Sequence, residues 1–285
     1  MLVNQNKVIE CGPYTLDYNH KTLVMGILNA TPDSFSDGGK YSSLENAVEH
    51  ARLMVEQGAD IIDIGGESTR PGYEQISAEE ELERVVPLIE AVSKAVQVPI
   101  SIDTYKADVA DKALEAGAHI INDIWGAKED PKMSYIAAKY DAPIILMHNR
   151  HNRDYKDFYR DVVNDLFESI RIVKEAGVKD EKIILDPGIG FGKDLAENLQ
   201  MMRDLDKLVS IGYPVLLGTS KKSLIGGVLN VPVQERAEGT GATICFGIQK
   251  GCQIIRIHDV KEMSRMAKMM DAMMGKGEYH GQNIR

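Results

Sequence analysis

The feature of this sequence that most constrains its fold is a regular alternation of short apolar runs with longer segments of helical periodicity. The apolar runs are brief and rich in β-branched residues, which predicts strands buried on both faces of a parallel sheet. In the segments between them, apolar residues recur every three or four positions, as on helices that pack one face on a sheet. The predicted strands are Leu23–Leu28, Ile61–Ile64, Pro99–Ile102, His119–Ile121, Pro143–Met147, Lys182–Leu185, Pro214–Leu217 and Gln253–Ile257.

This alternation predicts the α/β class and, within it, a single (β/α)8 TIM barrel. The 285 residues suit one barrel, which typically takes roughly 250 residues. We expect one domain, with an N-terminal β-hairpin over the bottom of the barrel in residues 1–20, the barrel in 21–275 and a C-terminal tail in 276–285. A doubly wound open sheet is the alternative that the same pattern allows.

The net charge and the cysteine content of the chain limit the molecules that it can bind and the compartment in which it works. The formal net charge is −10 and no run of Lys and Arg is present, which argues against nucleic acid and anionic membranes. Three cysteines without a CxxC pair indicate a reducing compartment. The first ten residues are polar, and no apolar run approaches the roughly 18 residues that span a bilayer. We therefore expect a soluble, cytoplasmic protein that acts on small molecules.

A degenerate internal repeat links three of the predicted strands. Segments that begin at Gly58, Gly117 and Gly251 each hold a glycine, then a pair of isoleucines, then a polar residue five positions after the glycine. The glycine is predicted to end a helix in the left-handed conformation, and the isoleucines to form the core of the next strand. The polar residue then lies at the carboxyl end of that strand.

Polar side chains follow nearly every predicted strand. In a β/α barrel the carboxyl ends of the strands converge on one mouth, which is where active sites lie. These side chains are therefore predicted to share one site. They are Asn29, Asp103, Asn122, Asp123, His148, Asp186, Lys222, Arg256 and His258, together with the small or apolar Gly65, Gly66, Met147 and Gly218.

The residue types in this set suit a flat, nitrogen-rich heterocycle. Asp103, Asn122 and Asp186 can accept hydrogen bonds from amino and ring N–H groups, and Lys222 can donate to a ring carbonyl or nitrogen. Phe191 can supply an apolar wall. A second group suits phosphate, namely Asn29, Arg256 and His258.

Each candidate also has a purely structural interpretation. Asp103 can cap the helix that follows it, Asp186 can belong to the turn at Pro187–Gly188, and Lys222 can be a solvated lysine at a helix start. His148 and His151 are predicted to lie in a surface loop. Only the joint placement of the candidates at one rim favours a binding site.

Two long loops follow the first two strands, at residues 29–39 and 65–72. They combine glycines with hydroxyl and charged groups, which is typical of loops that close over a barrel mouth. The same composition also suits two ordinary exposed connections.

The sequence of these loops resembles that of a known family. Met25-Gly-Ile-Leu-Asn-Ala-Thr-Pro-Asp-Ser-Phe-Ser-Asp37 and Asp63-Ile-Gly-Gly-Glu-Ser-Thr-Arg-Pro-Gly72 are similar to the two signatures of dihydropteroate synthases. Asp186-Pro-Gly-Ile-Gly-Phe-Gly192, Gly218-Thr-Ser-Lys-Lys-Ser223 and Arg256-Ile-His258 continue the resemblance, which runs from about residue 20 to 270. Lys221 departs from it, since many members have arginine there.

The resemblance implies a transferase that joins a dihydropterin pyrophosphate to 4-aminobenzoate. It implies a pterin pocket of Asp103, Asn122, Met147, Asp186, Phe191, Gly218, Lys222 and Arg256. It places pyrophosphate on Asn29, Arg256 and His258, with Asn29 also a ligand of Mg²⁺. It places 4-aminobenzoate on Phe35, Thr69, Arg70, Pro71 and Ser223, with help from Lys222.

In this scheme the residues that act on the reaction are Asn29, Asp37, Lys222, Arg256 and His258. Asp37 faces the reacting carbon. The family also implies a homodimer, and methionines clustered between Met263 and Met274 predict that the last helices form its interface.

Three other functions remain open at this point. A pterin-binding methyltransferase would share Asp103, Asn122 and Asp186 but would not need the Thr69–Pro71 loop or a phosphate cluster. A barrel aldolase would use Lys222 as a Schiff-base nucleophile with a lowered pKa. A silent binding module would bind without turnover.

Overall fold

The computed structural model describes residues 7–30, 40–67 and 75–277. Its centre is a parallel sheet of eight strands in the order β8-β7-β6-β5-β4-β3-β10-β9. All eight predicted strands are present within one to two residues of the predicted bounds. They are β3 (Leu23–Asn29), β4 (Ile61–Gly65), β5 (Ile100–Asp103), β6 (Ile120–Asp123), β7 (Ile144–Met147), β8 (Ile183–Asp186), β9 (Leu216–Leu217) and β10 (Ile254–Ile257).

The two ends of this sheet meet, so that the strands form a barrel. Leu185 of β8 forms a parallel bridge with Val215, which directly precedes β9. The Leu185 backbone N–H also donates to the Pro214 carbonyl at 2.9 Å. The predicted TIM barrel is therefore confirmed, and the doubly wound open sheet is excluded.

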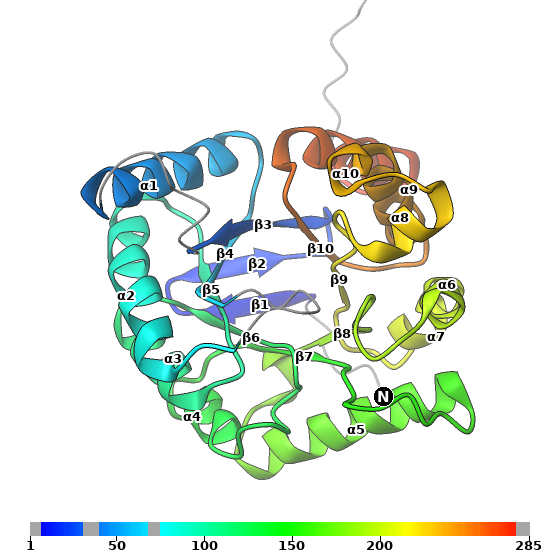
Figure 1. Ribbon diagram of the computed structural model, residues 1–285, viewed down its shortest axis with the longest axis horizontal. Coiled ribbons are helices and arrows are strands. Elements are labelled where there is room, and N and C mark those ends of the chain that lie inside the picture. Colours follow the sequence, from blue (N-terminus) through cyan, green and yellow to red (C-terminus); the bar gives the residue numbers. More distant parts are fainter. Residues whose placement is uncertain (1–6, 31–39, 68–74, 278–285) are drawn as a thin grey trace, which may run out of the picture.

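Helices follow every strand and form a ring around the barrel (Figure 1). Two α-helices follow β8, and two follow β9. The α-helices are α1 (Lys40–Glu56), α2 (Ala78–Ala95), α3 (Ala107–Glu115), α4 (Met133–Lys139), α5 (Phe158–Glu175), α6 (Leu195–Arg203), α7 (Leu205–Val209), α8 (Ser223–Leu229), α9 (Ala237–Gln249) and α10 (Val260–Met273), with short 3-10 turns η2 (Asp180–Lys182) and η3 (Val233–Glu235).

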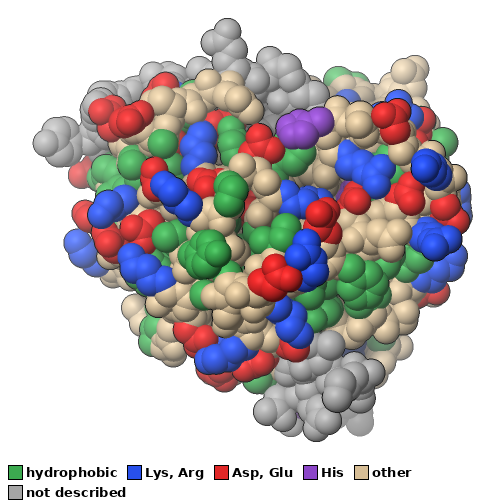
Figure 2. All heavy atoms as spheres, turned by 90° about the horizontal axis from the view of Figure 1, so that it is seen from below, with side chains coloured by type: hydrophobic (Ala, Val, Ile, Leu, Met, Phe, Trp, Pro, Cys, Tyr) green, Lys and Arg blue, Asp and Glu red, His purple; other side chains and the backbone are tan. Residues whose placement is uncertain are grey.

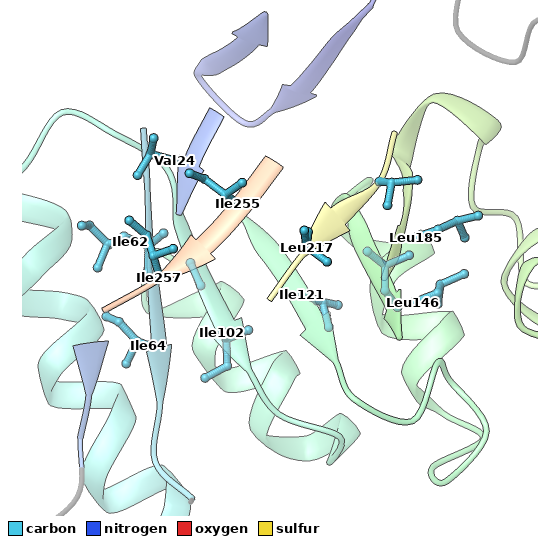
Figure 3. Packing of buried hydrophobic residues seen from close by; sticks show 14 of the residues in the cluster. Val24, Ile62, Ile64, Ile102, Ile121, Leu146, Leu185, Leu217, Ile255 and Ile257 are labelled. Atoms are coloured by element: carbon cyan, nitrogen blue, oxygen red, sulfur yellow. The ribbon is translucent and has the colours of Figure 1, made fainter. Parts of the chain in front are cut away.

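Alternate residues of each strand face opposite sides of the barrel wall, because the side-chain period of a strand is two. One set, which includes Val24, Ile62, Ile121 and Leu185, packs outward against the helices in the larger core cluster (Figure 3). The other set faces the barrel interior and forms a second cluster. Its strand members are Leu23, Met25, Ile61, Ile120, Ile145, Ile184, Leu216 and Ile254.

The predicted N-terminal hairpin is present and covers the lower end of the barrel. Strands β1 (Val8–Cys11) and β2 (Tyr14–Asp17) pair antiparallel. Buried Ile9 and Leu16 join the interior cluster, whose strand members lie at the amino ends of the strands. Lys182 Nζ donates to the Glu10 carbonyl at 2.6 Å. The hairpin thus closes one end of the barrel with apolar side chains and leaves the other end for the site.

The glycines of the internal repeat have the predicted conformation. Gly58, Gly117 and Gly251 have φ values of 107°, 116° and 98°. Each follows a helix, α1, α3 or α9, and precedes a strand, β4, β6 or β10. At three places around the barrel, the repeat therefore marks the point where a helix ends and the next barrel strand begins.

On the face seen in Figure 2, acidic and basic side chains are interspersed rather than gathered by sign. Among the described residues, no helix is both long enough and apolar enough to cross a membrane.

Candidate active site

The inward residues at the carboxyl ends of five strands form a polar layer above the apolar interior. Each lies two positions beyond another inward residue on the same strand, which is an isoleucine on four strands and Ser101 on β5, so it faces the same side of the wall. The acidic and amide members are almost fully buried. The five residues of the layer are Asp63 on β4, Asp103 on β5, Asn122 on β6, Asp186 on β8 and Arg256 on β10.

Arg256 lies at the centre of this layer and is held by two carboxylates. Its Nε donates to Asp63 Oδ2 and its Nη2 to Asp103 Oδ2, both at 2.6 Å. Asn122 Nδ2 donates to both oxygens of Asp63 at 3.3 and 3.4 Å. Burial alone would lower the pKa of Arg256, but Asp63 and Asp103 outweigh it and raise the pKa. The guanidinium is therefore a fixed positive charge.

Two side-chain oxygens on the inward face of β5 form no hydrogen bond with the described residues. Asp103 Oδ1 and Ser101 Oγ are buried without a hydrogen-bond partner among the described residues. Burial raises the pKa of Asp103, although Arg256 opposes the shift. A buried acceptor without a donor costs stability unless a ligand supplies the donor. The Asp103 carboxylate is thus suited to an N–H group of a bound heterocycle.

Asp186 and Lys222 form the second half of the site. Asp186 Oδ1 accepts from the Gly188 backbone N–H at 2.7 Å, and burial raises the pKa of this carboxyl. Lys222 Nζ donates to the Ile189 carbonyl at 2.5 Å and lies 4.7 Å from the centre of the Phe191 ring. Burial lowers the pKa of Lys222 to about 8, and Asp186 opposes the shift.

The remaining predicted residues lie around this pair and at the rim. Met147 is buried at the end of β7. Gly218 leaves room in the mouth, because a Cβ there would lie 3.8 Å from Lys222 Nζ and 3.9 Å from Asp186 Oδ2. Ser223 begins α8 and is exposed.

The phosphate candidates are less enclosed. Asn29 ends β3 and is half-buried. His258 follows β10, is also half-buried, and its Nδ1 lies 2.8 Å from Ser220 Oγ. Five further predicted residues, namely Phe35, Asp37, Thr69, Arg70 and Pro71, lie outside the described residues.

Two interpretations of single residues change. His148 was expected in a surface loop, and this is wrong, because its side chain is fully buried and its Nε2 lies 3.0 Å from Asp165 Oδ2. Asp123 was placed at the mouth, but its carboxylate accepts from the backbone N–H groups of Trp125 and Ala127 at 2.8 and 2.7 Å. It therefore stabilises the loop after β6. His151 is exposed, as expected.

Asp63 is the main residue of the site that the sequence analysis missed. Its two carboxylate oxygens contact both Arg256 and Asn122. The repeat contains the signal that identifies it, because Asp63, Asn122 and Arg256 are the three polar residues five positions after the repeated glycines. Equivalent positions in three β/α units thus form one network.

The residues of the site can be compared with the ligands that the expected Mg²⁺ would need. Within residues 7–30, 40–67 and 75–277, no group of three or more His, Cys, Asp or Glu side chains could hold a metal ion. Mg²⁺ often keeps several waters and binds through one or two protein ligands plus substrate phosphates. Asn29 offers a single side-chain amide oxygen, and the resemblance groups it with Arg256 and His258 as a phosphate ligand, which fits that mode of binding.

Comparison with known proteins agrees with this geometry. Residues 25–258 match the family of pterin binding enzymes, and the chain belongs to this family. A dihydropteroate synthase of Bacillus subtilis is 61% identical over 278 residues, which cover 98% of each chain. Within the family, the chain therefore groups with the dihydropteroate synthases.

Two solved structures show the same fold. A dihydropteroate synthase of Clostridium difficile, determined in the presence of pteroic acid, has a TM-score of 0.88 and 51% identity, and the match covers 90% of this chain and 98% of the other. A Xanthomonas albilineans dihydropteroate synthase with 4-aminobenzoic acid has a TM-score of 0.90 and 37% identity, covering 95% and 99%.

Proposed function

We propose that this chain condenses 6-hydroxymethyl-7,8-dihydropterin pyrophosphate with 4-aminobenzoate to give 7,8-dihydropteroate and pyrophosphate. The observation that carries the proposal is the buried polar layer at the barrel mouth, in which Arg256 lies between Asp63 and Asp103 while one Asp103 oxygen has no donor among the described residues. Such a layer suits a heterocycle with several N–H groups and a negatively charged substituent.

The pterin ring fits the deep part of the mouth. Its amino and ring N–H groups would donate to Asp103 and Asp186, while Asn122 and Lys222 would donate to its carbonyl and ring nitrogen. Phe191 and Met147 supply apolar surface on either side of these polar contacts. Gly218 keeps the space between Asp186 and Arg256 open.

The pyrophosphate group fits the rim, where Asn29 ends β3, Arg256 lies near the end of β10 and His258 follows that strand. Departure of pyrophosphate is faster when its developing negative charge is neutralised by fixed positive groups. Arg256 is such a group, because two carboxylates hold it in place and raise its pKa. Mg²⁺ held by Asn29 and the phosphates would add Lewis-acid neutralisation of the same charge.

We infer a displacement without a covalent enzyme intermediate. The bond between the pterin methylene carbon and the pyrophosphate oxygen breaks, and pyrophosphate takes the electron pair. The amino nitrogen of 4-aminobenzoate then forms the new C–N bond and loses one proton. Asp37 stabilises the positive charge on the methylene carbon in this scheme, and Phe35, Thr69, Arg70, Pro71 and Ser223 hold 4-aminobenzoate.

The direct test is release of pyrophosphate from the pterin substrate with Mg²⁺, measured with and without 4-aminobenzoate. Release that depends on 4-aminobenzoate and yields dihydropteroate supports the proposal. Trapping of a carbonyl substrate on Lys222 by borohydride would instead support an aldolase. Binding of the pterin substrate without any turnover would leave only a binding module.

Location and assembly are part of the same proposal. We place the enzyme in the cytoplasm because Cys11, Cys245 and Cys252 are all free thiols, as expected in a reducing compartment. We also infer a homodimer through α10, whose exposed methionines form an apolar surface.

A further inference from the structure

A chain of four buried or half-buried polar side chains lies behind the loop that joins β8 to α6, outside the site described above. Lys193 Nζ lies 2.7 Å from His148 Nδ1. On the other side of the ring, His148 Nε2 lies 3.0 Å from Asp165 Oδ2. Arg150 donates to both oxygens of Asp165, at 2.5 and 3.1 Å. The chain thus runs from the surface pair Arg150–Asp165 inward to Lys193.

The Lys193 ammonium donates all three of its N–H groups, to two carbonyls of the loop and to the His148 ring behind it. Besides His148, it donates to the carbonyls of Gly188 and Phe191, both at 3.0 Å. These three acceptors are neutral groups, so the charge is desolvated without a direct ion pair. Burial lowers the pKa of Lys193 to about 7, and Asp186 opposes the shift. An apolar side chain would avoid this desolvation but would remove the Lys193 donor from the Phe191 carbonyl and from the Gly188 carbonyl, of which the second also accepts from the Phe191 backbone N–H.

These contacts define the protonation of His148. When Lys193 is protonated its ammonium group has no acceptor, so His148 Nδ1 accepts from it and carries no proton. The ring proton then resides on Nε2 and is donated to Asp165. Burial lowers the pKa of His148 to about 4, with Asp165 opposing and Lys193 reinforcing the shift. The neutral imidazole therefore transmits the orientation set by Asp165 to the lysine.

The loop that Lys193 holds is the one that contacts Lys222. The Ile189 carbonyl accepts from Lys222 Nζ at 2.5 Å, and the Phe191 ring lies 4.7 Å from the same nitrogen. Gly188 has a φ of 66°, and a Cβ there would meet the His148 carbonyl oxygen at 1.9 Å. The loop therefore follows a path that few residues allow, and Lys193 fixes the carbonyls on either side of Ile189.

We propose that Lys193, oriented by neutral His148 and Asp165, is a positioning residue of the enzyme that sets the place of Phe191 and of the Lys222 ammonium in the pterin site. It contacts no substrate and acts only through the loop of residues 187–193. The inference rests on the proposed function for its effect on catalysis, but the state of His148 can be measured without any turnover.

The first experiment compares Lys193→Met with Lys174→Met. Lys174 is an exposed lysine near the end of α5 that pairs with Asp180, so it is a matched control outside the site. In Lys193→Met we expect the Kd for the pterin substrate, measured by calorimetry, to rise on the order of 10- to 100-fold, because small displacements of positioning groups have effects of that size. The KM for 4-aminobenzoate should change far less, and Lys174→Met should match the wild type in both.

A purely structural role predicts a different result. Lys193→Met would then lower the melting temperature and the fraction of active enzyme, and the remaining enzyme would bind the pterin substrate with unchanged Kd. That outcome would overturn the proposal. Wild-type enzyme that releases no pyrophosphate would instead overturn the proposed function, and the second measurement would still report on Lys193.

The second measurement is a long-range ¹H–¹⁵N spectrum of the histidine rings, with the His148 signals assigned by their loss in His148→Asn. In the wild type we expect a neutral ring protonated on Nε2. In Lys193→Met, His148 should titrate at a higher pH, because the nearby positive charge is gone. Identical His148 signals and titration in both proteins would show that Lys193 does not interact with the ring, and would refute the inference.

Discussion

Asp63 illustrates how a single buried residue affects the charge state and position of Arg256. Its carboxylate is fully buried and contacts Arg256 Nε at 2.6 Å. In Asp63→Asn, Arg256 keeps a neutral acceptor but loses one of two balancing charges, and breaking a buried pair in this way destabilises by roughly 3–5 kcal/mol. We expect a lower free energy of unfolding in urea. Asp206→Asn, which removes an exposed partner of Lys250, is the control and should unfold like the wild type.

The lowered pKa of Lys222 predicts a pH dependence of the reaction. Because its pKa is about 8 in the folded, free protein, the ammonium loses its proton as the pH rises through that value. Its charge-assisted hydrogen bond to the pterin is then lost, so kcat/KM for the pterin substrate should fall above about pH 8. In Lys222→Arg the side chain stays charged, and this fall should be absent. A fall at the same pH in both proteins would assign it to another group.

For single residues, the sequence predicts most of the side chains that meet at the barrel mouth, but it misplaces His148 and misses Asp63. Asp103, Asn122, Asp186 and Arg256 meet because the carboxyl ends of parallel strands converge. His148 was wrongly placed on the surface, because only the position of α5 relative to β7 shows that a residue just after the strand end is covered. Asp63 was missed because its partner Arg256 is distant in sequence, and only the pairing of both β4 and β10 with β3 brings the two together.

Among the elements, the hairpin of β1 and β2 has a role separable from the site. Ile9 is fully buried among the inward residues at the bottom of the barrel. Ile9→Ala should lower the free energy of unfolding by about 2–5 kcal/mol, as for other large-to-small core changes, and leave the pterin Kd unchanged. Thr15→Ala, at an exposed position of the same hairpin, is the control. A weaker pterin affinity in Ile9→Ala would show that the two ends of the barrel are coupled.

The strands were predicted closely because apolar, β-branched runs of this length have few other stable environments. Two strand ends differ by two residues, the end of β6 and the start of β9, which was expected at Pro214–Leu217 and is observed at Leu216–Leu217. Proline has no backbone N–H to donate to a neighbouring strand, and Val215 forms only an isolated bridge. The five predicted residues of the two long loops lie outside the described residues, so their placement remains a prediction from the resemblance.

For the whole molecule, α10 predicts the oligomeric state. Met269 and Met273 are 59% and 63% exposed, whereas Met263 on the same helix is buried against the barrel. The pair of exposed methionines should lie in the interface of a homodimer. The double variant Met269→Glu, Met273→Glu should therefore have the mass of a monomer in light scattering at micromolar concentration. Tyr135→Glu, at a 65% exposed position on α4, should remain a dimer, and a monomeric wild type would refute the assignment.

The two substrates are expected to bind in order. Lys222 and Ser223 belong to the barrel and the start of α8, whereas Thr69, Arg70 and Pro71 come from the second loop. If bound pterin and pyrophosphate organise that loop, 4-aminobenzoate binds weakly to the free enzyme and tightly once both are present with Mg²⁺. Calorimetric titration of 4-aminobenzoate under the two conditions tests this order. Equal affinities would show that its site is already formed in the free enzyme.

The joint between β8 and β9, which closes the barrel, lies next to the proposed pterin site. Between β8 and β9 the wall is held by the bridge from Leu185 to Val215 and by the hydrogen bond from the Leu185 N–H to the Pro214 carbonyl. Asp186 and Lys222 lie on opposite sides of this joint, and Lys222 Nζ already donates across it to the Ile189 carbonyl. In the proposed binding mode, a pterin that donates to Asp186 and accepts from Lys222 would add a further link between these two edges, so the substrate would complete the wall that encloses it.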